Sequence, residues 1–123
     1  MAGNTLILYT TQDGAAQFVL RELGGQLWLT QAEIAALYQT TVSNINKHIK
    51  AILAENELPE RATIEYYSIV QTEGGREIRR EVAHYALPMI IAIGYRVRST
   101  RGTQFRQWAT RTLGEYLQKG FAI

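Results

Sequence analysis

The chain has 123 residues, a net charge of +2 and no cysteine, which allows one domain with a real core and excludes disulfides, zinc–thiolate sites and thiol nucleophiles. No signal sequence is present, and the longest apolar run, residues 87–93, is far too short to span a bilayer. We therefore expect a cytoplasmic, nucleoid-associated protein with no membrane partner.

The first 29 residues are predicted to be rich in β-structure. Three β-prone runs are separated by turns that contain glycine. The runs cover residues 5–10, 17–23 and 26–29. We expect a small antiparallel sheet with Trp28 packed beneath the helices that follow, as a core residue and not as a ligand.

Residues 30–54 are typical of a helix-turn-helix. Thr30 and Glu33 have the spacing of a capping box, and Thr41 or Ser43 can cap a second helix. Each helix has one apolar face. The apolar residues are Ile34, Ala35, Leu37 and Tyr38, then Ile45, Ile49, Ile52 and Leu53. Gln39 occupies the turn position that usually has a positive φ, at a strain cost of about 1 kcal/mol.

The second helix presents short polar and basic residues of the kind that a DNA major groove accommodates. We predict that Ser43, Asn44, Asn46 and Lys47 approach base edges and that Lys50 binds a phosphate. The alternative is an ordinary helical hairpin in a core, with a solvated polar face. Apolar spacing alone does not separate these two interpretations.

Residues 63–85 are predicted to form a hairpin after a polar loop over 55–61. A hairpin that follows a helix-turn-helix is the wing of a winged-helix arrangement. Three arginines could touch phosphates at its tip, whereas the interleaved acids favour a solvated face with cross-strand pairs. These arginines are Arg76, Arg79 and Arg80.

Residues 87–120 are predicted to form a helical pair. The first helix is apolar nearly all round, with Pro88 at its first position and Gly94 as its C-terminal cap. The second helix is expected over 104–119. Its predicted buried stripe consists of Phe105, Trp108, Ala109, Thr112, Leu113, Tyr116 and Leu117.

Basic residues dominate the last third of the chain. Residues 82–123 contain six basic side chains and one acidic one, and such a local excess marks a surface for a polyanion. Cations at a helix N-terminus oppose the helix dipole, so arginines at that place favour phosphate binding over stability alone. The predicted phosphate ligands are Arg96, Arg98 and Arg101. Arg106 and Arg111 are interpreted as plain helix surface.

Two segments resemble a known family. Residues 85–121 read YALPMIIAIGYRVRSTRGTQFRQWATRTLGEYLQKGF, which closely resembles the signature of the RhuM family of bacterial virulence-associated proteins. The upstream segment WLTQAEIAALYQTTVSNINKHI is similar to that family's helix-turn-helix, although Gln39 replaces the glycine that many such turns carry. The resemblance covers residues 5–123 and implies the N-terminal, DNA-binding part of a longer protein. The last helix is also similar to the Bro-N domain of phage antirepressors.

We therefore predict an α+β fold and a single DNA-binding domain over 1–123, with a winged-helix-like helix-turn-helix, small antiparallel hairpins and a C-terminal helical pair. The expected partner is double-stranded DNA, bound with no cofactor or metal, in transcriptional or mobile-element regulation. A homodimer would read two half-sites. Two alternatives stay open. The chain could be an antirepressor-like module that binds an acidic protein, or it could be part of a toxin–antitoxin-like locus.

We expect no enzymatic activity. The two histidines, His48 and His84, have no metal-ligand spacing, and the acids form no paired constellation. We interpret His48 as a DNA-facing or helix-surface residue and His84 as a structural one.

Overall fold

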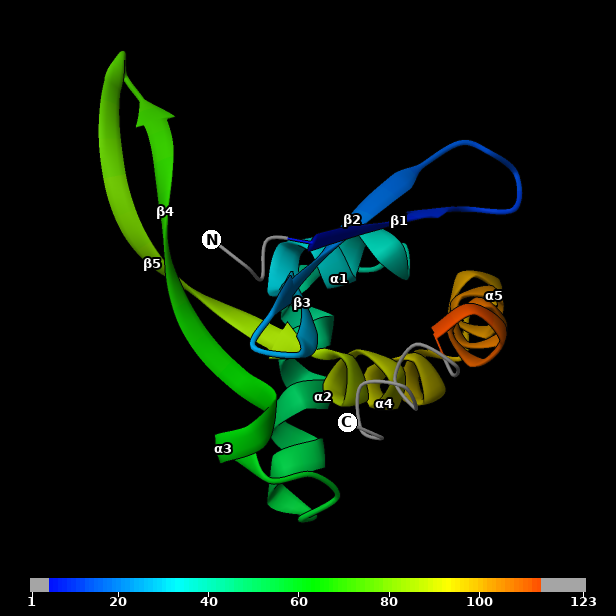
Figure 1. The fold of residues 1–123 in the computed structure, drawn as a ribbon. Helices are drawn as coiled ribbons and strands as arrows, with labels where there is room; N and C mark the ends of the chain where they lie inside the picture. The colour runs from blue at the N-terminus through cyan, green and yellow to red at the C-terminus, as the bar shows by residue number, and fades with distance from the viewer. Residues whose placement is uncertain (1–4, 114–123) are drawn as a thin grey trace.

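The strands form one antiparallel sheet, and the computed structural model describes residues 5–113 of the chain. The strands are β1 (Thr5–Thr10), β2 (Gln17–Leu23), β3 (Gln26–Thr30), β4 (Ile64–Glu73) and β5 (Arg76–Ala86). Their order in the sheet is β1-β2-β3-β5-β4, and each neighbouring pair is antiparallel (Figure 1). Glycine pairs at 24–25 and 74–75 have positive φ angles, which the tight turn between two twisted strands requires. The predicted strands and the α+β class are confirmed.

Five helices accompany the sheet in the described part of the chain. They are α1 (Gln31–Leu37), α2 (Val42–Ala54), α3 (Glu60–Thr63), α4 (Leu87–Val97) and α5 (Thr100–Trp108). A π-helical turn, Ala109–Leu113, continues α5. The first two helices match the predicted pair. Helix α3 is a single turn that begins in the predicted loop, over 55–61, and ends at Thr63, where the hairpin was expected to start.

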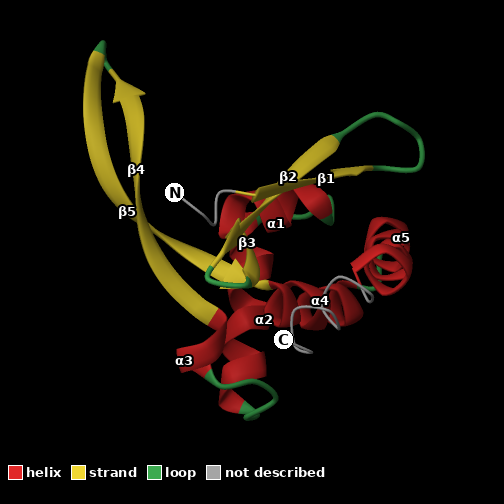
Figure 2. Ribbon diagram, in the orientation of Figure 1, coloured by secondary structure: helices red, strands yellow, loops and turns green. Residues whose placement is uncertain are grey.

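The hydrophobic core lies between one face of the sheet and the helices. Strand alternation turns Leu20, Leu27 and Leu29 to this face, and all three are fully buried. Helices α1 and α4 pack against β3, and α2 packs against both of these helices to complete the core (Figure 2). Within α5, Phe105 is also fully buried, and its ring meets that of Tyr9 edge-on at 5.2 Å.

The β4–β5 hairpin leaves the body of the molecule. Only the end of β5, His84–Ala86, pairs with β3. Beyond that point the two strands pair only with each other, and they extend as a curved ribbon (Figure 1). Beyond its junction with β3, the hairpin therefore projects away from the body of the molecule (Figure 1).

Three predictions about the helical pair are wrong. Gly94 is not a cap, because α4 continues through it to Val97 and Arg98 takes the left-handed cap position with φ of 56°. Helix α5 starts four residues earlier than Gln104, since the Ser99 hydroxyl caps it by accepting from the Gly102 N–H at 2.9 Å. Thr112 is exposed and does not belong to the buried stripe. The predicted helix beyond residue 113, with Tyr116 and Leu117, lies outside the described residues.

Trp28 is buried as predicted, but it does not pack beneath the helix pair. It lies between Leu27 and Leu29 on β3, so alternation turns it to the opposite face of the sheet. Its ring packs edge-on against Tyr67 at 5.8 Å, and its indole N–H donates to the Leu23 carbonyl at 3.0 Å. Trp28 therefore anchors the hairpin to the body of the protein.

Candidate nucleic-acid interface

The two short helices begin at side-chain caps. The Thr30 hydroxyl accepts from the Glu33 N–H at 3.2 Å, and the Glu33 carboxylate accepts from the Thr30 N–H at 2.7 Å, which completes the predicted capping box. Arg21 of β2 donates to the same carboxylate at 2.6 Å and, with these hydrogen bonds, holds the pKa of Glu33 below its usual value despite burial. The Thr41 hydroxyl caps α2 by accepting from the Asn44 N–H at 3.0 Å.

The turn between α1 and α2 is a Schellman motif. The Gln39 N–H donates to the Ala36 carbonyl at 3.3 Å, and the Thr40 N–H donates to the Ala35 carbonyl at 2.9 Å. Gln39 has φ of 56°, which confirms the predicted positive φ at this position. The motif fixes the angle at which α2 leaves α1, and it therefore sets the direction of the α2 surface.

Helix α2 has a polar stripe opposite its buried face. Ile45, Ile49 and Ile52 are buried, while Ser43, Lys47 and Lys50 are exposed. At 100° per residue the three exposed positions share one side of the helix, opposite the isoleucines. Within residues 5–113, no ion pair engages either lysine. This stripe presents two cationic side chains and a hydroxyl to the surroundings.

The two predicted asparagine readers flank the stripe and are half-buried. The Asn44 amide donates to the Thr40 hydroxyl at 2.9 Å, so its side chain is engaged by the turn. Asn46 is half-buried, and helical geometry puts it on the flank of α2 away from His48. Their predicted role as base readers stays a prediction.

His48 opens into a hollow of about 450 Å³ between α2 and α4. The residues that line it are His48, Glu57, Ala92, Tyr95, Arg96 and Arg98. Burial lowers the pKa of His48, and the nearby positive charges of Arg96 and Lys47 lower it further. The hollow places Arg98 beside the His48 side of α2.

Two of the three predicted phosphate-binding arginines have acidic neighbours. Arg96 donates to Glu55 at 2.7 Å and to Glu57 at 3.0 Å, which ties the end of α2 to α4 and raises the arginine pKa. Arg101 has a side chain only 11% exposed, and it lies 3.6 Å from the Asp13 carboxylate in the β1–β2 turn. Both guanidinium groups are thus partly neutralised within the protein.

The residues predicted to contact DNA therefore do not all lie on one surface. Lys47 and Lys50 lie on α2, and Arg98 is exposed next to its His48 side. Arg101 instead faces the β1–β2 turn, and Asn46 lies beside Lys50, on the side of α2 away from His48. The physical reason is the left-handed residue Arg98, which turns the chain between α4 and α5 and separates two arginines that are close in sequence.

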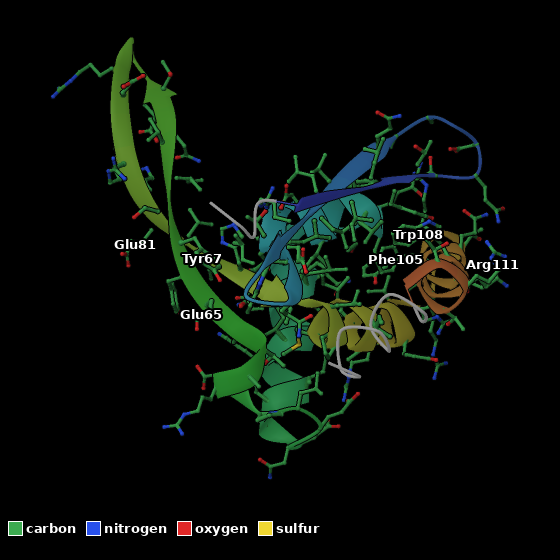
Figure 3. The ribbon with its side chains drawn as sticks, viewed as in Figure 1. Glu65, Tyr67, Glu81, Phe105, Trp108 and Arg111 are labelled. Carbon is green, nitrogen blue, oxygen red and sulfur yellow. The ribbon has the colours of Figure 1, made fainter. Side chains whose placement is uncertain are left out.

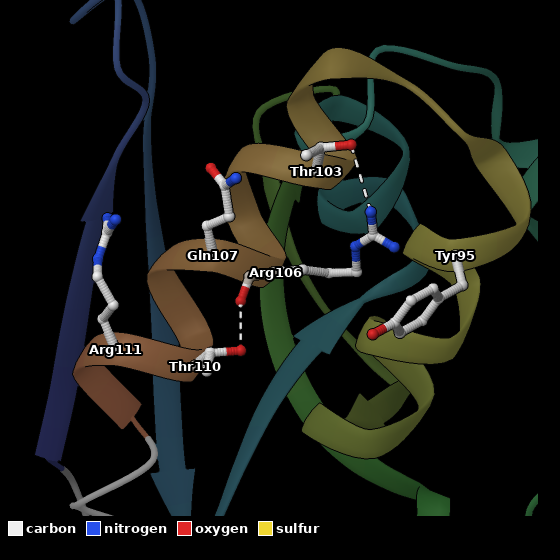
Figure 4. Close-up of a pocket in the computed structure, with 6 residues that line it drawn as sticks. All are labelled: Tyr95, Thr103, Arg106, Gln107, Thr110 and Arg111. Atoms are coloured by element: carbon white, nitrogen blue, oxygen red, sulfur yellow. Dashed lines mark hydrogen bonds between the residues drawn. The ribbon is translucent and has the colours of Figure 1, made fainter.

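Sequence reasoning missed an aromatic and cationic pair. Tyr95 is 63% exposed, and the Arg106 guanidinium lies 4.0 Å from the centre of its ring (Figure 4). Arg106 also donates to the Thr103 hydroxyl at 3.3 Å. These residues border a second hollow of about 500 Å³ along α5. Tyr95 and Arg106 are eleven residues apart on different helices, so no local spacing signalled the contact.

The hairpin carries one cross-strand ion pair of the kind that its charges favoured. Arg80 donates to Glu73 at 2.8 and 2.9 Å across the ribbon, while Arg76 and Arg79 are exposed. Glu65, Tyr67 and Glu81 lie along the same hairpin, at a distance from Phe105, Trp108 and Arg111 on the α5 side (Figure 3). The tip therefore contains basic and acidic groups side by side.

Neither a metal site nor a membrane span is found within residues 5–113. No group of three or more histidine and acidic side chains there is placed to hold a metal ion, and no helix there is both long and apolar enough to cross a bilayer. His84 is buried, and its ring Nδ1 lies 2.8 Å from the Val82 carbonyl oxygen. Burial lowers the pKa of His84.

Fold and site together define an α+β protein with a five-stranded antiparallel sheet and with basic residues on its second, fourth and fifth helices. The chain belongs to the RhuM family of virulence proteins, whose family model matches residues 62–123. The match includes β4, β5, α4 and α5, and it begins after the segment 30–54. Comparison with curated proteins and with solved structures gives no match.

Proposed function

We propose that this chain binds double-stranded DNA as a winged helix-turn-helix module, in the regulation of transcription or of a mobile element. The observation that carries the proposal is the stripe of Ser43, Lys47 and Lys50 on the outer side of α2. A helix with such a stripe, held by a capped partner helix and a fixed turn, suits insertion into a major groove.

The N-terminal end of α2 adds a further feature. Val42 is the first residue of the helix and 48% exposed, beside the exposed Ser43. An apolar side chain there can contact the methyl group of a thymine, and a hydroxyl can bond to any base edge. We assign base reading to this end of α2 and phosphate contacts to Lys50 and Arg98.

We interpret the β4–β5 hairpin as the wing of this module. It follows the two helices in sequence, and its strand β5 pairs with β3, the strand that leads into α1. One sheet therefore holds both the hairpin and the start of the helix pair. Its exposed Arg76 and Arg79 can touch the DNA backbone beside the groove. The proposal requires no catalytic step.

The test is a selection of bound duplexes from a random pool, followed by anisotropy titrations over a range of salt concentrations. Lys50→Ala should weaken all duplexes alike and lower the slope of log affinity against log salt by about 0.9. Ser43→Ala should relax the preference at one base pair, with a loss of about 1 kcal/mol or more on the selected duplex.

Arg61→Ala is the charge-matched control, because Arg61 is exposed on α3 and outside the proposed surface. It should leave the salt slope unchanged. A chain that selects no duplex even at low salt, or a Lys50→Ala slope equal to that of wild type, contradicts the proposal. Salt-sensitive binding to an acidic protein in the first case favours the antirepressor-like alternative.

A further inference from the structure

The hollow beside α5 combines positive charge, hydroxyl groups and an aromatic wall. Its lining consists of Tyr95, Thr103, Arg106, Gln107, Thr110 and Arg111 (Figure 4). Among these described residues, two carry a positive charge and none carries a negative one. All six lie within the segment that matches the family model. Arginine and hydroxyl groups with no acid between them suit an anionic ligand.

Arg106 is oriented before any ligand arrives. The Tyr95 ring lies under its guanidinium at 4.0 Å, and one of its N–H groups donates to Thr103. Stacking engages the flat face of the guanidinium, so the N–H groups along its edge stay directed outward. A pre-oriented arginine loses less conformational freedom when it binds a phosphate than a mobile one does.

The wide turn at the end of α5 brings a second cation to the same hollow. Residues 109–113 form a π-helical turn, in which hydrogen bonds span five residues instead of four. Arg111 lies on this turn and is exposed. Figure 4 shows Arg106 reaching toward Tyr95 on one side of α5, and Gln107 and Arg111 rising on the other side in this view. The two arginines therefore offer successive contacts along the hollow and not one shared clamp.

Tyr95 connects this hollow to the surface of α2. It also lines the hollow that contains His48 of α2 and Arg98. The exposed tyrosine thus stands between the proposed groove-reading helix and the arginines of α5. Tyr95 and Arg98 line the hollow next to α2, and Tyr95, Arg106 and Arg111 line the hollow along α5.

We propose that the α5 hollow binds the phosphodiester backbone of a nucleic-acid strand, with Arg106 and Arg111 on successive phosphates and Tyr95 as the residue that positions Arg106. This inference rests on the proposed DNA binding and extends its footprint past α2. It gives Arg106 and Arg111 a role in ligand binding, although the sequence alone indicated that both are ordinary residues of a helix surface.

The experiment measures salt-dependent anisotropy of the selected duplex with Arg106→Ala, Arg111→Ala and the Arg61→Ala control. Each of the first two variants should lower the salt slope by about 0.9, equally on selected and scrambled duplexes, because a phosphate contact carries no sequence information. Tyr95→Phe keeps the ring under Arg106 and should bind as wild type, whereas Tyr95→Ala should lose part of the Arg106 contribution. Unchanged slopes for both arginine variants, with a lowered slope for Lys50→Ala, overturn the inference and leave the proposed function standing.

A second probe separates the two proposals when no duplex binds. A short single-stranded oligothymidylate has phosphodiesters but no major groove, and it is titrated into the full chain with the arginine side-chain Nε–H signals observed by NMR. Salt-sensitive shifts of the Arg106 signal that are smaller in Tyr95→Ala support the hollow even if duplex binding fails. No shift at Arg106 or Arg111 together with no duplex binding overturns both proposals. Thermal unfolding of each variant confirms that the fold is retained.

Discussion

At the scale of single residues, Gly94 shows how closely two helices approach. A Cβ atom at this position would lie 2.7 Å from the hydroxyl oxygen of Tyr38 and 3.0 Å from its ring. Tyr38 is almost fully buried, and its hydroxyl donates to the Ile90 carbonyl of α4 at 2.6 Å. Burial raises the pKa of Tyr38, so the hydroxyl stays protonated and remains a donor. The glycine is therefore a packing requirement inside α4.

We expect Gly94→Ala to destabilise the protein by about 1–2 kcal/mol. Overpacking a core costs about 1–3 kcal/mol, and the better helix propensity of alanine returns at most about 1 kcal/mol. The measurement is the free energy of unfolding in urea for wild type, Gly94→Ala, Tyr38→Phe and the double variant. Because Tyr38→Phe removes the nearest atom, Gly94→Ala should cost less in that background. Purely additive effects would contradict the proposed contact.

At the scale of elements, the same terminal motif ends both α1 and α2. Gln39 after α1 and Asn56 after α2 have φ angles of 56° and 58°. In each motif the next residue donates its N–H five residues back, Thr40 to Ala35 and Glu57 to Ile52. Asparagine tolerates the left-handed region better than glutamine does. The turn after α1, at Gln39, is therefore more strained than the turn after α2, at Asn56.

Gln39→Gly should stabilise the protein by about 0.5 kcal/mol. Relief of about 1 kcal/mol of left-handed strain exceeds the added entropy of the unfolded chain. The thermal midpoint should rise by about 2 °C, measured by circular dichroism. Asn56→Gly is the matched control and should change the midpoint less, since the motif is the same and only the starting residue differs. Equal shifts in the two variants would mean that Gln39 is not strained.

Local chemistry explains which elements could be predicted. The strands, the capping box and the positive φ of Gln39 all depend on residues a few positions apart, and the structure confirms them. The cap assigned to Gly94 was wrong because the same residue type serves a close helix contact, which only Tyr38, far away in sequence, determines. The start of α5 was misplaced because a single serine is a weak indication of a helix cap, and the arginines near Ser99 are unfavourable in the first turn of a helix.

The candidate site was less predictable than the fold for the same reason. Exposure of Lys47 and Lys50 follows from the helical period, so the sequence placed them on the surface of α2. The partners of Arg96 and Arg101 lie on other elements, 39–41 and 88 residues away, and no spacing encodes them. The Tyr95–Arg106 stack depends on the turn at Arg98 and could not be anticipated.

At the scale of the whole molecule, the hairpin pairs with the sheet of the body through only three residues of β5, His84–Ala86, within the described part of the chain. The distal ribbon is stabilised by half-buried Ile69, Ile78 and Val82 and by the exposed Arg80–Glu73 pair. An exposed ion pair contributes roughly 0–1 kcal/mol, and a two-stranded ribbon on its own is marginal. The core that holds the remaining elements together therefore does not depend on the tip.

Shortening the hairpin should separate stability from DNA binding. Deletion of Gln71-Thr72 together with Glu77-Ile78 removes two facing pairs and keeps strand alternation and the Gly74-Gly75 turn. The free energy of unfolding should change by no more than about 1 kcal/mol, because these residues are outside the core. Duplex affinity should fall at least several-fold as the wing shortens, with anisotropy as the measurement. Full affinity in the shortened protein would remove the hairpin from the interface.

The pairing of β5 with β3 has a practical consequence for anyone who divides this protein. The family match begins at residue 62, yet β5 takes its neighbour strand from residues 26–30, and α4 packs against Tyr38. A truncation at that boundary would strip one edge from β5 and uncover the apolar side of α4. Truncated versions of the protein should therefore keep all residues from β1 onward. A fusion partner should be attached before β1 and not at residue 62, where the family match begins.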